Sequence, residues 1–276
     1  MPKTKKVQVK NNDYQYIEVL KRNRYKRHRY KRFFIEGVKS INLAIENNWE
    51  IDSFVYSGER PLSGWAKDVL RNSKADVHYE LSANLMEELS DKEDSSELIA
   101  IGKIMDRKIN DIKVKDDLLV VVFDRPSNPG NLGTIIRTCD AFGVDALIIT
   151  GHSVDLYDPI TIRSSIGAFF RLPVYRLESH KELDLLFAKL CRSNIDYRIV
   201  GTSIKGQYDI REMDYTKATI LIVGNETYGM SNNYREMCDV IVKIPIYGAV
   251  SSLNVGCATS IFLYEVDSQR RRIRNT

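Results

Sequence analysis

The chain has 276 residues, of which 43% are hydrophobic, and a formal net charge of +4; this length predicts two compact domains, each with its own core. No run approaches the roughly 18 to 20 apolar residues that a membrane span needs, and no apolar stretch typical of a secretory signal begins the chain, so we expect a soluble, cytoplasmic protein. The four cysteines and four histidines show no zinc-site spacing, which predicts reduced, mostly buried thiols and no metal.

Positive charge is concentrated at the N-terminal end. Residues 1–32 hold 12 Lys/Arg against two acids, whereas 29 Lys/Arg face 35 Asp/Glu in residues 33–276. Within 21–32 the cations alternate with Tyr25, His28 and Tyr30, and cations neutralise phosphates while aromatic rings stack on unpaired bases. We predict that 1–32 is a basic nucleic-acid-binding extension, with a solvated tail or a targeting signal as the alternative. Its predicted contacts are Lys21, Arg22, Arg24, Lys26, Arg27, Arg29, Lys31 and Arg32.

Short alternating elements follow in residues 33–106. Apolar residues three and four apart predict a helix over about 37–48, and the next run, 51–57, is typical of a strand. A helix around Trp65 to Leu70, a strand at 77–81, a short helix at 84–89 and a strand in 96–104 complete a small α/β domain. The acidic stretch 91–97 is predicted to be a surface loop, and the polar residues 107–117 a linker.

A second α/β domain is predicted over residues 118–276. Its first strand, 117–124, is a continuous apolar run of the kind found in buried parallel strands. Further strands are expected at 144–150, 196–203, 218–226 and 239–246, and helices at 131–142, 158–167, 180–192, 231–237 and 252–265. This alternation predicts a parallel sheet covered on both faces, with ligands bound at the loops after the carboxyl ends of its strands.

Three segments that follow predicted strands are rich in Gly, Asn and small polar residues: 125–143, 224–231 and 244–256. Glycine permits tight turns and a close approach of the backbone to a ligand. Neither the P-loop nor the glycine fingerprint of dinucleotide-binding folds is present. The common nucleotide-binding motifs therefore do not explain these loops.

Together the three segments resemble the motifs of the SpoU (TrmH) family, RNA 2'-O-ribose methyltransferases of the SPOUT class. The first matches over Asn131–Arg137, the second over Gly224–Glu226 with Gly229, and the third over Ile244–Ile246 and Ser252–Asn254. Residues 30–106, through Glu36-Gly37 and the order of elements, are similar to the substrate-binding domain of members that act on large-subunit rRNA. The resemblance implies a parallel-sheet α/β domain with a deep trefoil knot, preceded by a smaller α/β sandwich domain resembling a ribosomal-protein fold.

The resemblance also implies roles for individual residues. S-adenosylmethionine (AdoMet) would be bound by Thr202, Gly224, Ile244, Ile246 and Leu253, and the catalytic group would comprise Arg137, Asn131, Glu226, Ser252 and Asn254. A guanidinium stays protonated at ordinary pH, so Arg137 is better suited to bind a phosphate and stabilise a developing oxyanion than to act as a base. Arg163 and Ser165 would contact RNA. Helix capping is the structural alternative for Asn131 and Ser252, and loop main-chain bonding for Asn254.

The function implied is AdoMet-dependent methylation of a ribose 2'-hydroxyl of RNA, with large-subunit rRNA as the favoured substrate and a homodimer formed through the C-terminal domain. Three alternatives remain open: a tRNA 2'-O-methyltransferase, a base methyltransferase, and a non-catalytic RNA-binding protein on the same scaffold.

Overall fold

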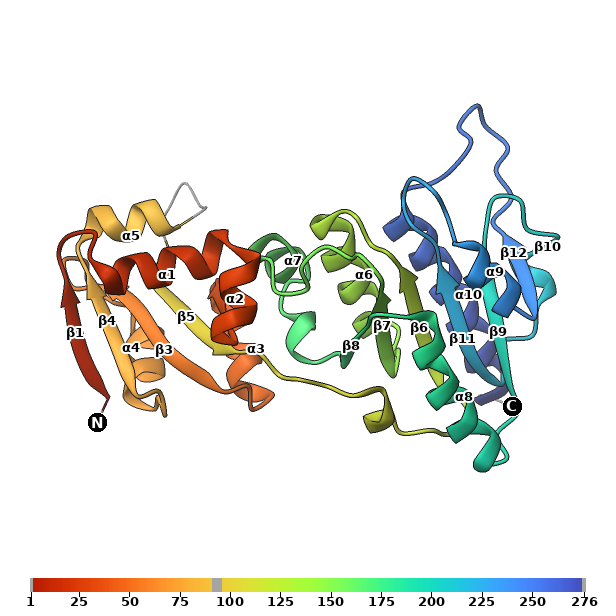
Figure 1. The fold of residues 1–276 in the computed structure, drawn as a ribbon, viewed down its shortest axis with the longest axis horizontal. Coiled ribbons are helices and arrows are strands. Elements are labelled where there is room, and N and C mark those ends of the chain that lie inside the picture. Colours follow the sequence, from red (N-terminus) through yellow and green to blue (C-terminus); the bar gives the residue numbers. More distant parts are fainter. Residues whose placement is uncertain (1, 91–95, 275–276) are drawn as a thin grey trace. The chain divides into compact units, whose positions relative to one another are not determined.

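The computed structural model describes residues 2–90 and 96–274, so most of the predicted acidic loop 91–97 lies outside the described residues. The chain forms two compact units (Figure 1). The first consists of residues 1–105 and 157–171, and the second of 106–156 and 172–276. No helix of the described residues is long and apolar enough to cross a membrane.

The first unit is built on a mixed five-stranded sheet. Its strands lie in the order β1 (Lys3–Val7), β4 (Val77–Leu81), β3 (Ile51–Ser57), β5 (Leu98–Lys103) and β2 (Arg32–Glu36). The first three of these are parallel, and β5 runs antiparallel to both β3 and β2. The helices of residues 2–90 are α1 (Asn12–Arg22), α2 (Arg24–Tyr30), α3 (Val38–Glu46), α4 (Gly64–Arg71) and α5 (Ala83–Leu89).

Residues 2–32 are part of this unit, which corrects the prediction of a separate basic extension. Strand β1 pairs with β4, so that Thr4 lies opposite His78. Helix α1 buries Tyr14, Ile17 and Leu20 in the same core as β3, β4 and α5. These apolar residues recur every three positions and form one face of a helix. The high charge of their neighbours concealed this periodicity.

A segment expected in the second domain also packs in the first unit. It contains α7 (Pro159–Ser164) and ends in a 3-10 turn at Ala168–Phe170. The indole Nε1 of Trp49 donates a hydrogen bond to the carbonyl oxygen of Phe170 (2.9 Å), and Phe169 and Tyr157 pack around Phe33. By its contacts the segment 157–171 groups with the first unit, because its buried aromatic rings pack in the core of that unit.

The second unit confirms the predicted parallel sheet. Its strands lie in the order β10 (Tyr208–Asp209), β12 (Val240–Lys243), β9 (Tyr197–Thr202), β11 (Ala218–Val223), β6 (Leu119–Asp124), β7 (Ala146–Thr150) and β8 (Val174–Leu177), and every pairing is parallel. All six residues of β6 are buried, as expected of a strand covered on both faces. Strands β8 and β10 were not predicted.

Helices connect and cover these strands. They are α6 (Pro129–Ala141), α8 (Leu183–Arg192), α9 (Asn232–Met237) and α10 (Val255–Arg274), of which α10 extends nine residues beyond the predicted end at 265. Leu183, Leu186 and Leu190 of α8 pack against one face of the sheet, together with Val120 and Val122. Helices α6 and α10 pack against each other, with the hydroxyl groups of Thr138 and Ser260 3.2 Å apart.

The strand order places two of the three motif loops side by side. From β6 the chain continues outward through β7 and β8, whereas β9 and β12 lie on the far side of β11. Strands β6 and β11 are neighbours at the point where the direction of winding reverses. Such a switch point separates the two outgoing loops and creates a crevice at the carboxyl ends of the strands. The loops that leave β6 and β11 therefore begin at the usual ligand site of a doubly wound sheet.

Candidate functional site

A cavity of about 450 Å³ lies at this edge of the sheet in the second unit. It is lined by the residues that follow β9, β11 and β12, together with the start of α10. All five predicted cofactor-binding residues line it, as do two of the predicted catalytic residues: Thr202, Gly224, Ile244, Ile246 and Leu253, and Glu226 and Ser252.

Gly224 is needed where β11 leaves the sheet. A Cβ atom at this position would lie 2.3 Å from the amide nitrogen of Met230 and 2.4 Å from the carbonyl carbon of Gly229. The following turn folds back on itself, since the amide of Asn225 donates to the carbonyl of Gly229 (3.1 Å) and the amide of Gly229 donates to the carbonyl of Asn225 (3.0 Å). Gly229 has φ of +68°, which glycine adopts without strain.

Glu226 connects the second motif with the first. Its carboxylate accepts hydrogen bonds from the amides of Ser127 (3.0 Å) and Asn128 (3.1 Å) and from the Ser127 hydroxyl (2.7 Å). These amides lie just before helix α6, where a negative charge is favoured by the helix dipole. The Nδ2 atom of Asn131 also donates to the Glu226 carboxylate (3.4 Å).

Asn131 extends this network to the third motif. Its Oδ1 accepts a hydrogen bond from Nδ2 of Asn254 (3.1 Å). Asn254 in turn accepts from the amide of Gly256 (2.8 Å) at the start of α10, and the residue that caps α6 is Asn128, whose Oδ1 accepts from the amide of Asn131 (3.0 Å). The structure thus brings Asn131, Glu226 and Asn254 together, and assigns the capping roles to Asn128 and Asn254 rather than to Asn131 and Ser252.

A pair of residues at the end of β6 was missed by the sequence analysis. The Asp124 carboxylate is buried. It accepts hydrogen bonds from Nε and Nη2 of Arg125, both at 2.9 Å, and from the amide of Ser231 at 2.8 Å. Arg125 also donates to the carbonyl of Gly229 (3.3 Å) and has φ of 52°. The hydrogen bonds to Asp124 raise the pKa of Arg125 above its ordinary value. This pair therefore holds the turn after β11 against the end of β6, and a positive φ at a non-glycine residue is a sign of local strain.

Arg137 does not lie in the cavity of its own chain. It is exposed on α6, six residues after Asn131, which corresponds to about 9 Å along a helix axis. It is absent from the cavity lining, and no hydrogen bond or ion pair is found for it among the described residues. Within one chain, the residues predicted to bind the cofactor line one cavity, whereas Arg137 stands apart from them.

At least four of the predicted RNA contacts of the basic segment are engaged within the first unit, among them Arg22, which forms an ion pair with Glu18 (3.4 Å). Arg27 is buried, and its guanidinium donates to the carbonyls of Leu20 (3.0 Å) and Lys21 (2.8 Å). The ammonium of Lys21 donates to the carbonyl of Leu89 (2.6 Å), and Arg32 forms an ion pair with Asp52 (2.6 Å). The prediction of an RNA contact is wrong for Arg27, because a buried guanidinium that satisfies carbonyls cannot reach a phosphate.

The predicted contact through Ser165 is also wrong. This side chain is fully buried and donates to the carbonyl of Ile162 (2.7 Å). Arg163, by contrast, is exposed on α7. In the basic segment Arg22, Arg24, Arg29 and Lys31 are exposed as well. The surface that remains open to RNA is therefore smaller than the sequence suggested and includes part of the segment 157–171.

A second cavity, of about 650 Å³, lies within the first unit. Trp49, Trp65 and Phe54 form part of its wall, and its lining contains five carboxylate side chains against two lysines. None of the predicted site residues lines it, and the excess of carboxylates makes it unsuitable for RNA phosphates. No group of His, Cys, Asp or Glu within 2–90 and 96–274 could hold a metal ion.

Two family profiles, both of SpoU proteins, together match most of the chain. The SpoU rRNA Methylase family profile matches residues 118–264, and the SpoU L30e-like domain profile matches residues 11–100. A 23S rRNA (uridine(2479)-2'-O)-methyltransferase of Streptomyces viridochromogenes is 38% identical over 271 residues, which cover 98% of this chain and 94% of that protein.

Solved structures agree with the sequence comparison. The SpoU methyltransferase AviRb from Streptomyces viridochromogenes, in complex with AdoMet, has a TM-score of 0.90 at 39% identity, with 95% of this chain and 99% of that chain covered. An AdoMet-bound rRNA methyltransferase from Sinorhizobium meliloti has a TM-score of 0.86 at 26% identity, with 98% of each chain covered.

Proposed function

Because the chain belongs to the SpoU rRNA methylase family, we propose that it transfers the methyl group of AdoMet to a ribose 2'-hydroxyl of large-subunit rRNA. The observation that carries this proposal is the convergence of the second and third motif loops on one cavity of about 450 Å³, to which the first motif is joined by the hydrogen bond between Asn131 and Glu226. Relatives named as 23S rRNA 2'-O-methyltransferases in two organisms support the substrate.

The residues of the cavity suit AdoMet. Gly224 lines the cavity with main-chain atoms alone, so its amide and carbonyl groups can approach the edge of an adenine. Ile244, Ile246 and Leu253 supply apolar cover for the ring. When bound, AdoMet supplies a methyl group already activated by its sulfonium.

The chain's own residues then have to hold the ribose in line with the methyl group, since orientation supplies much of the rate in such a transfer. The Glu226–Asn131–Asn254 network fixes the three loops relative to one another. Ser252, which lines the cavity, is placed to bond the substrate or the cofactor. We expect Arg137 to bind an RNA phosphate and stabilise negative charge that develops on the 2'-oxygen.

In a homodimer Arg137 can take part in catalysis although it lies outside the cavity of its own chain. On α10, Cys257, Ile261 and Tyr264 are exposed along one stripe, and Thr134, Arg137 and Ala141 form a second exposed stripe on α6. These two helices pack side by side. A twofold contact through them would cover the apolar side chains and bring Arg137 towards the cavity of the partner subunit. We also propose that the second unit contains the deep trefoil knot that the family resemblance implies.

The first unit is proposed to bind the RNA. Its exposed cations on α2 and α7, among them Arg24, Arg29 and Arg163, supply charge for phosphates, and Tyr25 is 69% exposed beside them. Exposed cations on a folded domain lose less entropy on binding than the same residues on a flexible tail.

Methylation of defined RNAs in vitro tests the proposal. The purified protein, AdoMet and either 23S rRNA or total tRNA would be incubated, and the nucleosides analysed by mass spectrometry. A 2'-O-methylated nucleoside from 23S rRNA alone is the expected result. A 2'-O-methylated nucleoside from tRNA would show that tRNA is a substrate instead, and a methylated base would show that the enzyme does not act on the ribose. Calorimetry that detects no AdoMet binding would leave a non-catalytic RNA-binding scaffold.

A further inference from the structure

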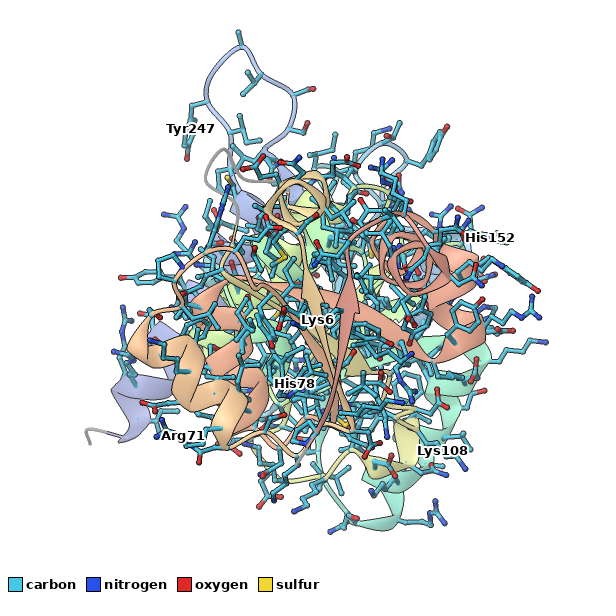
Figure 2. The ribbon with its side chains drawn as sticks, turned by 90° about the vertical axis from the view of Figure 1, so that its left-hand side faces the viewer. Lys6, Arg71, His78, Lys108, His152 and Tyr247 are labelled. Atoms are coloured by element: carbon cyan, nitrogen blue, oxygen red, sulfur yellow. The ribbon has the colours of Figure 1, made fainter. Side chains whose placement is uncertain are left out.

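Two exposed tyrosines belong to the loops that build the cofactor cavity. Tyr228 lies in the turn after β11, lines the cavity and is 79% exposed. Tyr247 lies in the loop after β12 and is 92% exposed, and this loop stands out from the rest of the second unit (Figure 2). Of the two, only Tyr228 lines the cavity, so it is the residue within reach of a substrate held there.

Hydrogen bonds hold the main chain that carries Tyr228 in place. The Oδ1 atom of Asn225 accepts hydrogen bonds from the amides of Thr227 (2.9 Å) and Tyr228 (3.0 Å), and its Nδ2 donates to the carbonyl of Arg125 (2.7 Å). Glu226, two residues before Tyr228, accepts hydrogen bonds from the amides of Ser127 and Asn128. The turn is therefore tied at both of its ends and at its centre, and an aromatic ring on it is presented with little freedom of the main chain.

The Tyr228 side chain has no role within the fold that would explain this presentation. Its hydroxyl makes no hydrogen bond, and its ring no contact with another ring or a cation, among the described residues. A tyrosine that stays exposed in this way keeps both faces of its ring available. Rigid aromatic side chains at such positions stack on unpaired nucleobases, which have a π-face whatever their sequence.

We propose that Tyr228 is a substrate-binding residue that stacks on the base of the nucleotide whose ribose is methylated. The inference rests on the proposed function, because the ribose must enter the cavity next to AdoMet and its base is one glycosidic bond away. Stacking on Tyr228 replaces the neighbours that the base loses when it leaves the RNA stack. Tyr228 thereby aligns the nucleoside without touching the reacting atoms.

Tyr228→Ala, Tyr228→Phe and a control, Tyr208→Ala, test the inference by single-turnover methylation of an rRNA fragment that contains the mapped target. Tyr208 is exposed on β10 and does not line this cavity. Tyr228→Ala should lower the single-turnover rate constant at subsaturating RNA by about ten- to a hundredfold, the range of a lost base–aromatic stack, while Tyr228→Phe and Tyr208→Ala stay within about twofold of wild type. The Kd for AdoMet, measured by calorimetry, should be unchanged in all three variants.

An RNA with an abasic ribose at the target position isolates the contact. This substrate keeps the 2'-hydroxyl and removes only the base, so Tyr228→Ala and wild type should methylate it at the same reduced rate. A loss in Tyr228→Ala that is equally large on the abasic RNA would overturn the stacking contact, as would an unchanged rate on intact RNA or a matching loss of AdoMet affinity. Wild-type activity on intact RNA reports separately on the proposed function, whose failure would be seen there first.

Discussion

The basic segment 21–32 and the three motif loops both consist of conspicuous polar residues, but the structure uses them in different ways. In the motif loops, side chains about 100 positions apart in sequence bond directly to one another, as Glu226 does to Ser127 and Asn254 to Asn131. In the basic segment, Arg27 is buried and Arg32 is paired within the same unit, whereas Arg29 remains exposed. Residues chosen through the family motifs thus meet in space, whereas residues chosen by a local excess of charge include both buried, structural cations and exposed ones.

The largest expected effect comes from the motif residue that makes no contact with the others. Arg137→Ala should lower the single-turnover rate of methylation by about a hundredfold or more, the cost of losing one group that stabilises transition-state charge. The Kd for AdoMet should not change, because Arg137 lies outside the cavity. Arg176→Ala, which removes an exposed arginine of β8, is the matched control. A full rate in Arg137→Ala would remove this residue from the mechanism.

The next effect tests whether the motif network acts as a unit. Glu226→Gln keeps the shape of the side chain but loses the charge that accepts three hydrogen bonds from Ser127 and Asn128. Hydrogen bonds to a charged group contribute about 1.5–3 kcal/mol each, so we expect at least a tenfold loss of AdoMet affinity by calorimetry. Glu236→Gln on the exposed side of α9 serves as the control. Unchanged affinity in Glu226→Gln would mean that the loops hold their positions without this carboxylate.

The comparison also shows how far the sequence could predict the structure. Strands such as 51–57 and 77–81 were located to the residue, because their apolar patterns are local. The five residues predicted to bind the cofactor line one cavity, and they were chosen through the family motifs rather than through physical pattern, since Ile244 and Leu253 alone look like core residues. The placement of 157–171 in the first unit could not be predicted, because it depends on which aromatic rings meet in space. For the same reason Asp124 and Arg125 gave no signal beyond their position at the end of a strand.

Within the basic segment, a paired substitution separates the two kinds of cation. Arg27→Ala should lower the free energy of unfolding by about 2–4 kcal/mol, since the carbonyls of Leu20 and Lys21 lose a buried charged donor. Arg29→Ala should leave stability unchanged within about 0.5 kcal/mol and reduce the salt dependence of RNA binding by about one phosphate contact. Denaturant unfolding and binding titrations at several salt concentrations measure the two effects. The reverse outcome would place Arg27 on the RNA surface after all.

The smallest effect is a change in thiol reactivity that probes the dimer. The cysteines were expected to be mostly buried, but Cys191 and Cys257 are exposed in the single chain. Burial raises the pKa of Cys238 to about 12 and that of Cys139 further above its ordinary value, so neither forms an appreciable thiolate at neutral pH. Iodoacetamide should therefore modify Cys191 readily in all conditions.

If α6 and α10 form the twofold contact, Cys257 on the exposed stripe of α10 is covered by the partner subunit. Mass spectrometry of peptides can follow the alkylation of both thiols. At high protein concentration Cys257 should react at least about tenfold more slowly than Cys191, because a thiol must be accessible to react. On dilution its rate should approach that of Cys191. Equal rates at every concentration would place the subunit contact elsewhere. Arg137 would then need another route to a cavity that it does not line in its own chain.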